Sequence, residues 1–461
     1  MSPIELVWIL AHLMWALGAA VYMFDGYRSF ILGREGFVTN TTPEIPDVQR
    51  ELDKRKLATV PLIKFQITTR GREVHVINKG IESAVRCSEH VPWKGRVMVD
   101  VITEDPKDVE EINAAFKAPG VPLRILLVPK NYKTPRGTRL KARALHYSTE
   151  WRRTLAEERG YVVHFDAESQ MEPVDFVRLL YNLVRSDGKM KLSEGPILYP
   201  LEWNRSNMIS RQLESNRVFD CFHCHILMEN PPPYHLHGSN LVVEEKMLIE
   251  LGWDFGLSRG RPLLAEDLLF GMRAFALKGK EIFGWSGAAI LEQPPFSIKD
   301  SVRQRIRWVT GVWQAIDVIS REPEYKAIPR REMRRLKAVV IARLSVYGMG
   351  FFAGFFSVLL ALIAISDAFA GTQIAANIPQ AWRDISLLLL PGVFLWLGTS
   401  QIGLYKNLQR VQMARRRRVL EHFKVLIATP VGALVETAAA LYATLNWWLR
   451  GNHVTWIPTP K

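Results

Sequence analysis

Two acidic pairs are the residues of this 461-residue sequence best suited to chemistry: Asp166 with Glu168, and Glu266 with Asp267. Asp166-Ala-Glu168 follows the apolar run YVVHF, and in an extended segment side chains two residues apart point the same way. Both carboxylates could therefore face one cation, and Mg²⁺ or Mn²⁺ takes one or two carboxylates together with substrate phosphate oxygens. The spacing predicts a divalent metal site, with a turn or helix cap as the structural alternative.

The second acidic pair, Glu266-Asp267, opens an amphipathic stretch, RPLLAEDLLFGMRAFALKG. Acidic residues at a helix N-terminus are often there only because they oppose the helix dipole favourably. The chemical interpretation is that one of the carboxylates acts as a general base on a rigid element. Both interpretations place the pair in the first turn of a helix.

A basic and aromatic cluster, QRIRW at 304–308, lies in the helical stretch SIKDSVRQRIRWVTGVWQ. Helical spacing puts Gln304, Arg307 and Trp308 on one face, with Arg303 beside Arg307. Guanidinium groups bind pyrophosphate oxygens in bidentate fashion. A basic helix that contacts anionic lipid is the alternative, but it leaves the glutamine and the tryptophan unexplained.

These groups need an α/β scaffold to bring them together. Short β-rich runs alternate with helical stretches, and the predicted strands lie at 62–69, 96–103, 123–128, 161–166, 195–200 and 239–243. Such alternation predicts a mostly parallel sheet with helices on both faces. Ligands of these sheets bind beyond the carboxyl ends of the strands, where Asp166 and Glu168 are expected and where RVMVDVITED supplies Asp100 and Glu104.

Apolar segments predict a membrane protein. Residues 4–24, 344–365 and 385–405 have the length and composition of spanning helices, and the basic flanks of the last two are expected on the cytoplasmic side. Residues 425–449 are interrupted by Pro430 and Glu436, which favours an interfacial or re-entrant helix. The net charge of +14 suits anionic head groups, nucleic acid or a phosphorylated substrate. Three cysteines exclude a disulfide framework.

Taken in chain order, DAE (166–168), AED (265–267) and QRIRW (304–308) resemble the DxD, ED and Q-x-x-R-W elements of family-2 glycosyltransferases. LEQPPFSIKD and WIPTPK resemble segments of the membrane-integrated cellulose- and mannan-synthase-like enzymes. HFDAES, KARAL and AEDLLFGMRAF are similar to the Egghead-type β-1,4-mannosyltransferases, which share the glutamate at position 168. The resemblance spans roughly residues 65–313. It implies a GT-A fold: a mostly parallel mixed sheet, covered by helices, that binds a nucleotide sugar.

The resemblance also implies roles for the candidate residues. Asp267 would remove the acceptor hydroxyl proton, with Glu266 beside it, and Asp166 and Glu168 would hold Mg²⁺ or Mn²⁺ on the diphosphate. A single displacement would invert the anomeric carbon, so an α-linked donor would give a β-glycoside. The other implied contacts are Thr68, Arg70, Asp100 and Glu104 at the base and ribose, Lys141 at the nucleotide, Gln304, Arg305, Arg307 and Trp308 at the pyrophosphate and acceptor, Gly238 and Ser239 at the acceptor, and Lys461 at phosphate.

The expected organisation has four parts: a transmembrane helix (1–24), a linker (25–60), a cytoplasmic GT-A domain (61–318), and a C-terminal part (319–461). The last contains interfacial helices, two transmembrane helices and WIPTPK as a lid over the donor. The expected location is the plasma or inner membrane. The expected partners are GDP-mannose or a UDP-sugar, a glycolipid or glycan acceptor, and the lipid bilayer, but not nucleic acid.

Some residues resemble metal ligands without completing a site. Cys221-Phe-His223-Cys224-His225 has suitable side chains, but zinc sites usually join two separated ligand pairs, and no second pair is evident. A structural role is expected for this segment. His235 and His237, in PPPYHLHGSN, are expected on a loop, either as part of a turn or in contact with the acceptor.

Two other functions stay open from the sequence. One is a processive β-glycan synthase that uses a UDP-sugar such as UDP-glucose. The other is a non-catalytic membrane adaptor that binds anionic lipid or nucleic acid through its basic surface. The adaptor predicts salt-dependent polyanion binding and no metal dependence.

Overall fold

The computed structural model describes residues 42–71, 74–117, 120–233, 235–344 and 400–451, with isolated positions in 6–13, 363–371 and 397–398. The predicted spans at 4–24 and 344–365, most of the span at 385–405, and WIPTPK with Lys461 lie outside the described residues.

A seven-stranded mixed sheet forms the centre of the α/β domain, in the order β3-β2-β1-β4-β7-β5-β8. Strands β1 to β4 pair in parallel, β7 runs antiparallel to both β4 and β5, and β5 pairs in parallel with β8. The bounds are β1 Ile63–Thr68, β2 Val97–Thr103, β3 Leu123–Leu127, β4 Tyr161–Asp166, β5 Leu192–Glu194, β7 Leu241–Glu244 and β8 Phe283–Trp285, with β6 Ile197–Leu198 and β9 Ile290–Leu291 as a separate parallel pair. The predicted mostly parallel sheet is confirmed.

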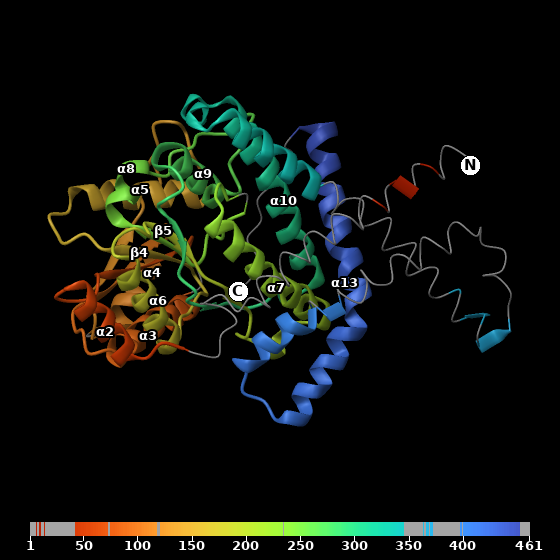
Figure 1. Ribbon diagram of the computed structural model, residues 1–461, viewed down its shortest axis with the longest axis horizontal. Helices are drawn as coiled ribbons and strands as arrows, with labels where there is room; N and C mark the ends of the chain where they lie inside the picture. Colours follow the sequence, from red (N-terminus) through yellow and green to blue (C-terminus); the bar gives the residue numbers. More distant parts are fainter. Residues whose placement is uncertain are drawn as a thin grey trace.

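Helices cover both faces of this sheet (Figure 1). One face carries α2 (Ile45–Arg55), α3 (Val74–His90), α4 (Pro106–Ala115) and α6 (Pro173–Ser186), and the other carries α5 (Lys141–Thr154), α8 (Glu245–Leu251) and α9 (Glu266–Lys278). The first face is apolar because alternate residues of β1, such as Phe65, point into it, and Phe65 packs on Phe165 and Phe176 at ring-centroid distances of 5.0 and 5.7 Å.

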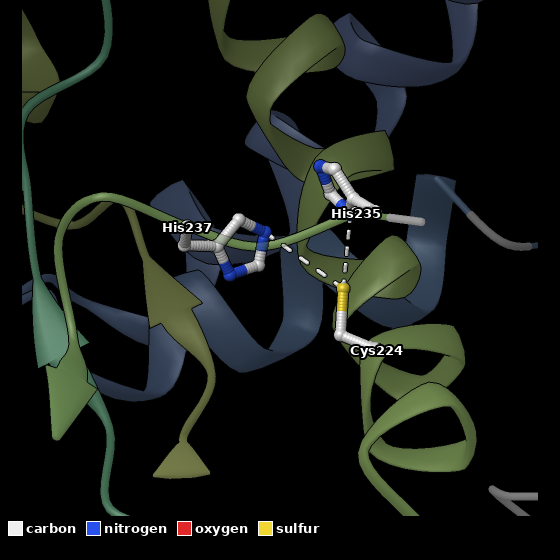
Figure 2. A group of neighbouring side chains, drawn as sticks. All are labelled: Cys224, His235 and His237. Carbon is white, nitrogen blue, oxygen red and sulfur yellow. Dashed lines mark hydrogen bonds between the residues drawn. The ribbon is translucent and has the colours of Figure 1, made fainter. Parts of the chain in front are cut away.

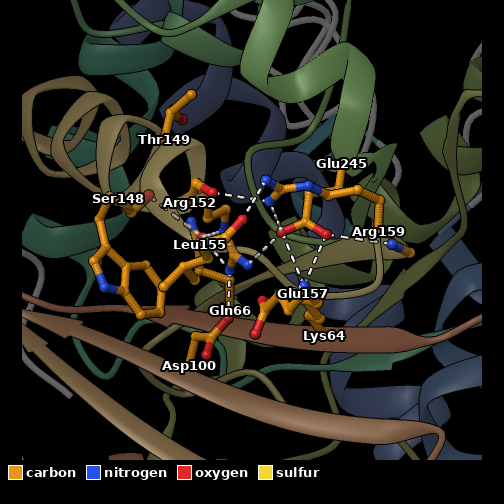
Figure 3. A network of polar contacts seen from close by, with 12 residues as sticks. Lys64, Gln66, Asp100, Ser148, Thr149, Arg152, Leu155, Glu157, Arg159 and Glu245 are labelled. Atoms are coloured by element: carbon orange, nitrogen blue, oxygen red, sulfur yellow. Dashed lines mark hydrogen bonds and ion pairs between the residues drawn. The ribbon is translucent and has the colours of Figure 1, made fainter.

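The intervening residues of β1 and β2 point to the opposite face and form a buried polar network under α5 (Figure 3). Asp100 belongs to it: its carboxylate accepts hydrogen bonds from Arg124 at 2.6 and 2.9 Å and from Arg152. The donor-binding role predicted for Asp100 therefore has no support from its position and stays a prediction. The residue lies inside β2 rather than at its end, is fully buried, and uses both oxygens on arginines.

Three long helices lie beside one another next to the sheet domain: α7 (Met208–Glu229), α10 (Ile298–Arg321) and α13 (Arg415–Arg450) (Figure 1). Polar contacts join them, among them Trp313 Nε1 to Thr444 Oγ1 at 3.2 Å. Residues 400–409 are also helical, and Asn407 Oδ1 accepts a hydrogen bond from the backbone of Tyr199 at 2.8 Å. The C-terminal helices thus pack against the α/β domain. The described residues also form two 3₁₀ helices, Trp203–Arg205 and Pro323–Ala327.

Within the part of the chain that the structure describes, α13 alone has the length and apolarity to cross a membrane, and its most apolar 18-residue window has a mean hydropathy of 1.6. It runs unbroken through Pro430 and Glu436, and the interfacial or re-entrant placement predicted for residues 425–449 stays a prediction. Proline removes one backbone hydrogen bond, while packing of α13 against α7 and α10 keeps the rest of the helix together. Large apolar side chains remain uncovered on it, including Ile427 (71% exposed) and Leu449 (80% exposed).

Candidate active site

The carboxyl ends of β1 and β4 meet at one edge of the sheet. Thr68 and Asp166 are the last residues of the two strands and are partners in the β1–β4 register. Lys141, the first residue of α5, donates a hydrogen bond from Nζ to Asp166 Oδ1. The buried Thr68 Oγ1 makes no hydrogen bond within the described residues. The sheet thus brings together two side chains that the sequence assigned separately to the donor and to the metal.

The segment after β4 differs from its prediction. Ala167 and Glu168 form a turn, closed by a hydrogen bond from Ser169 N to the Asp166 carbonyl at 3.1 Å, and not the extended segment expected. The Asp166 side chain is 37% exposed, whereas Glu168 is buried with only 7% exposed. The two carboxylates therefore have different surroundings, and alternation along a strand does not relate them.

Gly238 lies where Lys141 and Asp267 approach each other. Its carbonyl accepts a hydrogen bond from Lys141 Nζ at 3.2 Å. A Cβ atom added at Gly238 would lie 3.1 Å from Asp267 Oδ2 and 3.3 Å from Lys141 Nζ. Only a glycine leaves this space open. Asp267 itself is in the first turn of α9, as predicted, and its Oδ1 accepts a hydrogen bond from Leu268 N at 2.8 Å.

The charges at this point perturb one another. Burial and the adjacent Glu266 carboxylate raise the pKa of Asp267 to about 7, against the opposing effects of the Leu268 N–H and Lys141. Burial alone would lower the pKa of Lys141, but Asp166, Glu266 and Asp267 together raise it above its ordinary value. A carboxyl group that titrates near neutrality beside a cation is suited to proton transfer.

Helix α10 directs Arg307 and Arg305 to opposite sides. Burial lowers the pKa of Arg307, while Asp166 and Glu266 oppose that shift, so Arg307 is within electrostatic range of the acidic cluster. Arg305 is buried and pairs with Glu214 of α7 at 3.2 Å. Two residues apart on a helix means a rotation of roughly 200°, so Arg305 is directed at α7, and the pyrophosphate role predicted for it stays a prediction.

Trp308 and Gln304, in the same QRIRW segment, also belong to α10. The guanidinium of Arg217, on α7, stacks 3.9 Å from the centre of the Trp308 ring and fixes its orientation. Gln304 Oε1 is buried and makes no hydrogen bond within the described residues. Among the residues predicted near the base and ribose, Arg70 is exposed after β1, and Glu104, just past β2, pairs with Arg143 of α5 at 2.7 Å.

Sequence reasoning missed two members of the cluster, Glu292 and Arg217. Glu292 follows β9 and accepts a hydrogen bond from Ser169 Oγ at 3.2 Å. Burial and the Asp166 carboxylate raise the pKa of Glu292 to about 7, although Ser239 and Arg217 act against this shift. Glu292 belongs to LEQPPFSIKD, and the resemblance of this segment to membrane-integrated enzymes is the sequence signal that points to it. Arg217 lies in the middle of α7, where the sequence marks no motif.

The donor set at this edge fits a hard divalent cation. Asp166, Glu266 and Asp267 are close enough for their charges to raise the pKa of Asp267, and Asp166 does the same to Glu292. Carboxylate oxygens gathered in this way suit Mg²⁺ or Mn²⁺, and in this structure Lys141 is the cation paired with Asp166.

Comparisons with known proteins agree with this arrangement. The model of glycosyl transferase family group 2 matches residues 161–399, just over half of the chain. The chain is 31% identical over 193 residues to beta-1,4-mannosyltransferase egh of Drosophila melanogaster, which covers 41% of this chain and 40% of that protein. It is 25% identical over 255 residues to beta-1,4-mannosyltransferase bre-3 of Caenorhabditis elegans, which covers 55% and 52% respectively.

Two solved structures align at low identity. One is the mannosyltransferase PcManGT from Pyrobaculum calidifontis in complex with GDP-Man and Mn²⁺, at 14% identity and a TM-score of 0.44, covering 91% of this chain and 99% of that chain. The other is TarS 1-349 of S. aureus, at 11% identity and a TM-score of 0.33, covering 82% and 90%. The matched region spans only about half the length of the relatives named above. Since the family match extends over more than half of its residues, this chain belongs to glycosyl transferase family group 2.

Proposed function

We propose that the protein is a membrane-embedded, inverting mannosyltransferase that moves mannose from GDP-mannose to a lipid-linked or glycan acceptor and forms a β-glycosidic bond. One observation carries the proposal: Lys141 bonds both to Asp166 and to the Gly238 carbonyl, and a Cβ atom at Gly238 would lie 3.1 Å from the Asp267 carboxylate. Arg307 is within electrostatic range of these acids. A base, cations and a cation-binding acid then share the space beyond the ends of the strands, where α/β sheets bind ligands.

Asp267 acts as the base in this proposal. The acceptor hydroxyl loses its proton to the Asp267 carboxylate while its oxygen forms the new bond to the anomeric carbon. The bond from that carbon to the diphosphate breaks on the opposite side, and its electron pair leaves with the nucleoside diphosphate. A base whose pKa is about 7 combines a sufficient ionised fraction with adequate basicity near neutral pH.

The leaving diphosphate requires positive charge. Arg307, within electrostatic range of the acidic cluster, would contact its oxygens, and Lys141 would exchange its present bond to Asp166 for contact with the nucleotide. Asp166 and Glu168 would hold a Mg²⁺ or Mn²⁺ ion, which when bound neutralises charge on the diphosphate. Trp308, oriented by Arg217, offers an aromatic face to the acceptor sugar.

GDP-mannose is the preferred donor because both relatives are beta-1,4-mannosyltransferases by name. The proposed layout keeps residues 61–318 as the cytoplasmic catalytic domain and the flanking segments in the membrane. The apolar side chains left uncovered on α13 support contact with lipid. Lys461 in WIPTPK is proposed as a phosphate contact of the lid.

A donor panel tests the proposal. Purified protein in lipid nanodiscs is given GDP-mannose, UDP-glucose or other UDP-sugars with Mg²⁺ or Mn²⁺, and nucleoside diphosphate release and the anomeric configuration of the product are measured. GDP release with a β-mannoside product is expected, and Asp267→Asn should abolish it while Glu281→Gln, a carboxylate that is 85% exposed, leaves it unchanged. Release of UDP without release of GDP would show that the donor is a UDP-sugar and not GDP-mannose. An α-linked product would refute the single displacement.

A further inference from the structure

A second group of ligand-type side chains lies between α7 and the loop that leads to β7. Cys224 is on α7, and His235 and His237 are on the loop between α7 and β7; Figure 2 shows both imidazoles directed at the Cys224 sulfur. His235 Nδ1 is 3.2 Å from Sγ and His237 Nε2 is 3.8 Å from it. The three ligand atoms lie within 4.8 Å of one another.

This spacing matches a common coordination sphere. Tetrahedral zinc with a Zn–S bond of roughly 2.3 Å and a Zn–N bond of roughly 2.05 Å separates sulfur from nitrogen by ~3.6 Å, and the two observed separations lie on either side of that value. A thiolate with two imidazoles is a borderline-soft set, which favours Zn²⁺ over the hard cations suited to the acidic cluster. Of the CFHCH segment only Cys224 belongs to this group, and its partners are the two histidines of the following loop.

The surroundings are those of a prepared ligand site. Glu194, at the end of β5, is fully buried; its Oε2 accepts a hydrogen bond from His237 N at 3.1 Å and lies 3.6 Å from His237 Nδ1. His237 Nε2 is directed at the sulfur, while Nδ1 has the Glu194 carboxylate as its neighbour but makes no hydrogen bond within the described residues; a small approach of the two would give the carboxylate–histidine pair typical of metal-binding histidines. Glu194 Oε1 makes no hydrogen bond within the described residues.

We propose that Cys224, His235 and His237 bind one Zn²⁺ ion, with Glu194 orienting His237 and a water molecule or Glu194 itself in the fourth position. Binding converts the Cys224 thiol to a thiolate and releases its proton to solvent. The ion ties the loop to α7. Because Gly238 directly follows His237 and lies against Asp267, the ion fixes the loop that borders the proposed base. The site stands on these contacts alone and does not rest on the identity of the donor sugar.

Cobalt substitution tests the thiolate directly. The full-length protein in detergent is stripped of metal, dialysed against excess Mg²⁺ to fill hard oxygen sites, and titrated with Co²⁺ alone. A thiolate-to-cobalt charge-transfer band that saturates at about one equivalent is expected. Its absence in the wild-type protein overturns the proposal without any variant, and so does a band of equal intensity in Cys224→Ser.

Cys221 provides a matched control, since it lies on the same helix three residues earlier, is equally buried, and its sulfur is next to the backbone of Ile197 instead of the histidines. Zinc content after the same dialysis should be about one ion per chain in the wild type and in Cys221→Ala, and at least ~10-fold lower in Cys224→Ser and His237→Ala. Glu194→Gln should weaken zinc affinity ~10-fold or more. Equal zinc in Cys224→Ser and Cys221→Ala would overturn the assignment.

Discussion

The ionised Asp267 carboxylate should lower the free energy of unfolding, and Asp267→Asn should remove that destabilisation. Asparagine keeps the size of the side chain and the oxygen that accepts the Leu268 hydrogen bond, but it carries no charge. The folded-state pKa is raised from 3.8 to about 7 by burial and by Glu266. A group with a raised folded pKa stabilises the fold when protonated, so this contribution is present below the unfolded pKa and is lost as pH rises through the folded pKa.

The magnitude follows from the shift. A displacement of about 3 pKa units sets an upper limit of about 4 kcal/mol on the cost of the ionised carboxylate. Between about pH 5 and pH 8 the stabilisation of Asp267→Asn over the wild type should grow by about 2–3 kcal/mol. For a chain of 461 residues that difference corresponds to a rise of roughly 2–3 °C in relative midpoint.

Two assays read the same variant. Thermal unfolding at pH 5 and pH 8 measures the difference in midpoint, with Glu281→Gln as the control because its exposed carboxylate should give no pH-dependent difference. Sugar transfer should fall ~10²–10⁴-fold in Asp267→Asn, while binding of the nucleoside diphosphate persists. Wild-type turnover would refute the role as base. A variant less stable than the wild type at pH 8 would refute the electrostatic account.

Three further substitutions separate site residues from structural ones. Arg307→Ala should lower kcat by about 10²–10³-fold with little change in thermal midpoint, because it removes a contact to the leaving group; an unchanged kcat would contradict this. Arg305→Ala should destabilise the fold by about 3–5 kcal/mol, because it leaves Glu214 buried without that partner, and should leave the Kd for nucleoside diphosphate unchanged; a selective loss of binding would support its pyrophosphate role. Gly238→Ala should lower kcat/KM and preserve the thermal midpoint, because its methyl group enters the space beside Asp267; full activity would mean that this space is not used.

Sequence patterns predicted the parts of the site that local structure controls. A β-rich run that ends in Asp166 is sufficient to place that carboxylate at a strand end, and Glu266-Asp267 before an apolar helical pattern is sufficient to place both in the first turn of α9. Neighbouring parallel strands then bring their ends to one edge, so Asp166 and Thr68 come together without any further information.

Tertiary pairing decided what the patterns could not. Arg305 and Arg307 are chemically identical and two residues apart, and only the position of Glu214 on α7 reveals which of the two is directed away from the acidic cluster. Cys224 and His237 are 13 residues apart in sequence and meet only because the loop after α7 folds back on it. The turn at Glu168 is a further example. Ser169 N donates to the Asp166 carbonyl and Ser169 Oγ accepts from Asp166 N, and these two hydrogen bonds, not strand alternation, set the chain direction there.

Charge compensation separates the structural acids from the proposed catalytic ones. Burial would raise the pKa of Asp100, but Arg152 and Arg124 lower it below its ordinary value, whereas Asp267 has more negative than positive charge around it. Folding therefore gains from the ionised form of Asp100 at pH values above its unfolded pKa, and loses from the ionised form of Asp267. A carboxylate that the fold itself does not neutralise has that charge available for a substrate proton or a cation.

The same argument gives opposite signs for two similar substitutions. At pH 8, Asp100→Asn should destabilise the protein by about 3 kcal/mol, because the fully buried Arg152 loses a partner and keeps only Glu245 at 3.2 Å as a counter-charge, while Asp267→Asn should stabilise it. Thermal midpoints of the two variants, each compared with the wild type in the same buffer, measure both signs. Asp100→Asn should also leave the choice of nucleotide unchanged, because its side chain faces arginines and not the edge of the sheet where the strands end. Equal signs for the two variants would show that burial alone, without the neighbouring charges, determines what a carboxylate does in this fold.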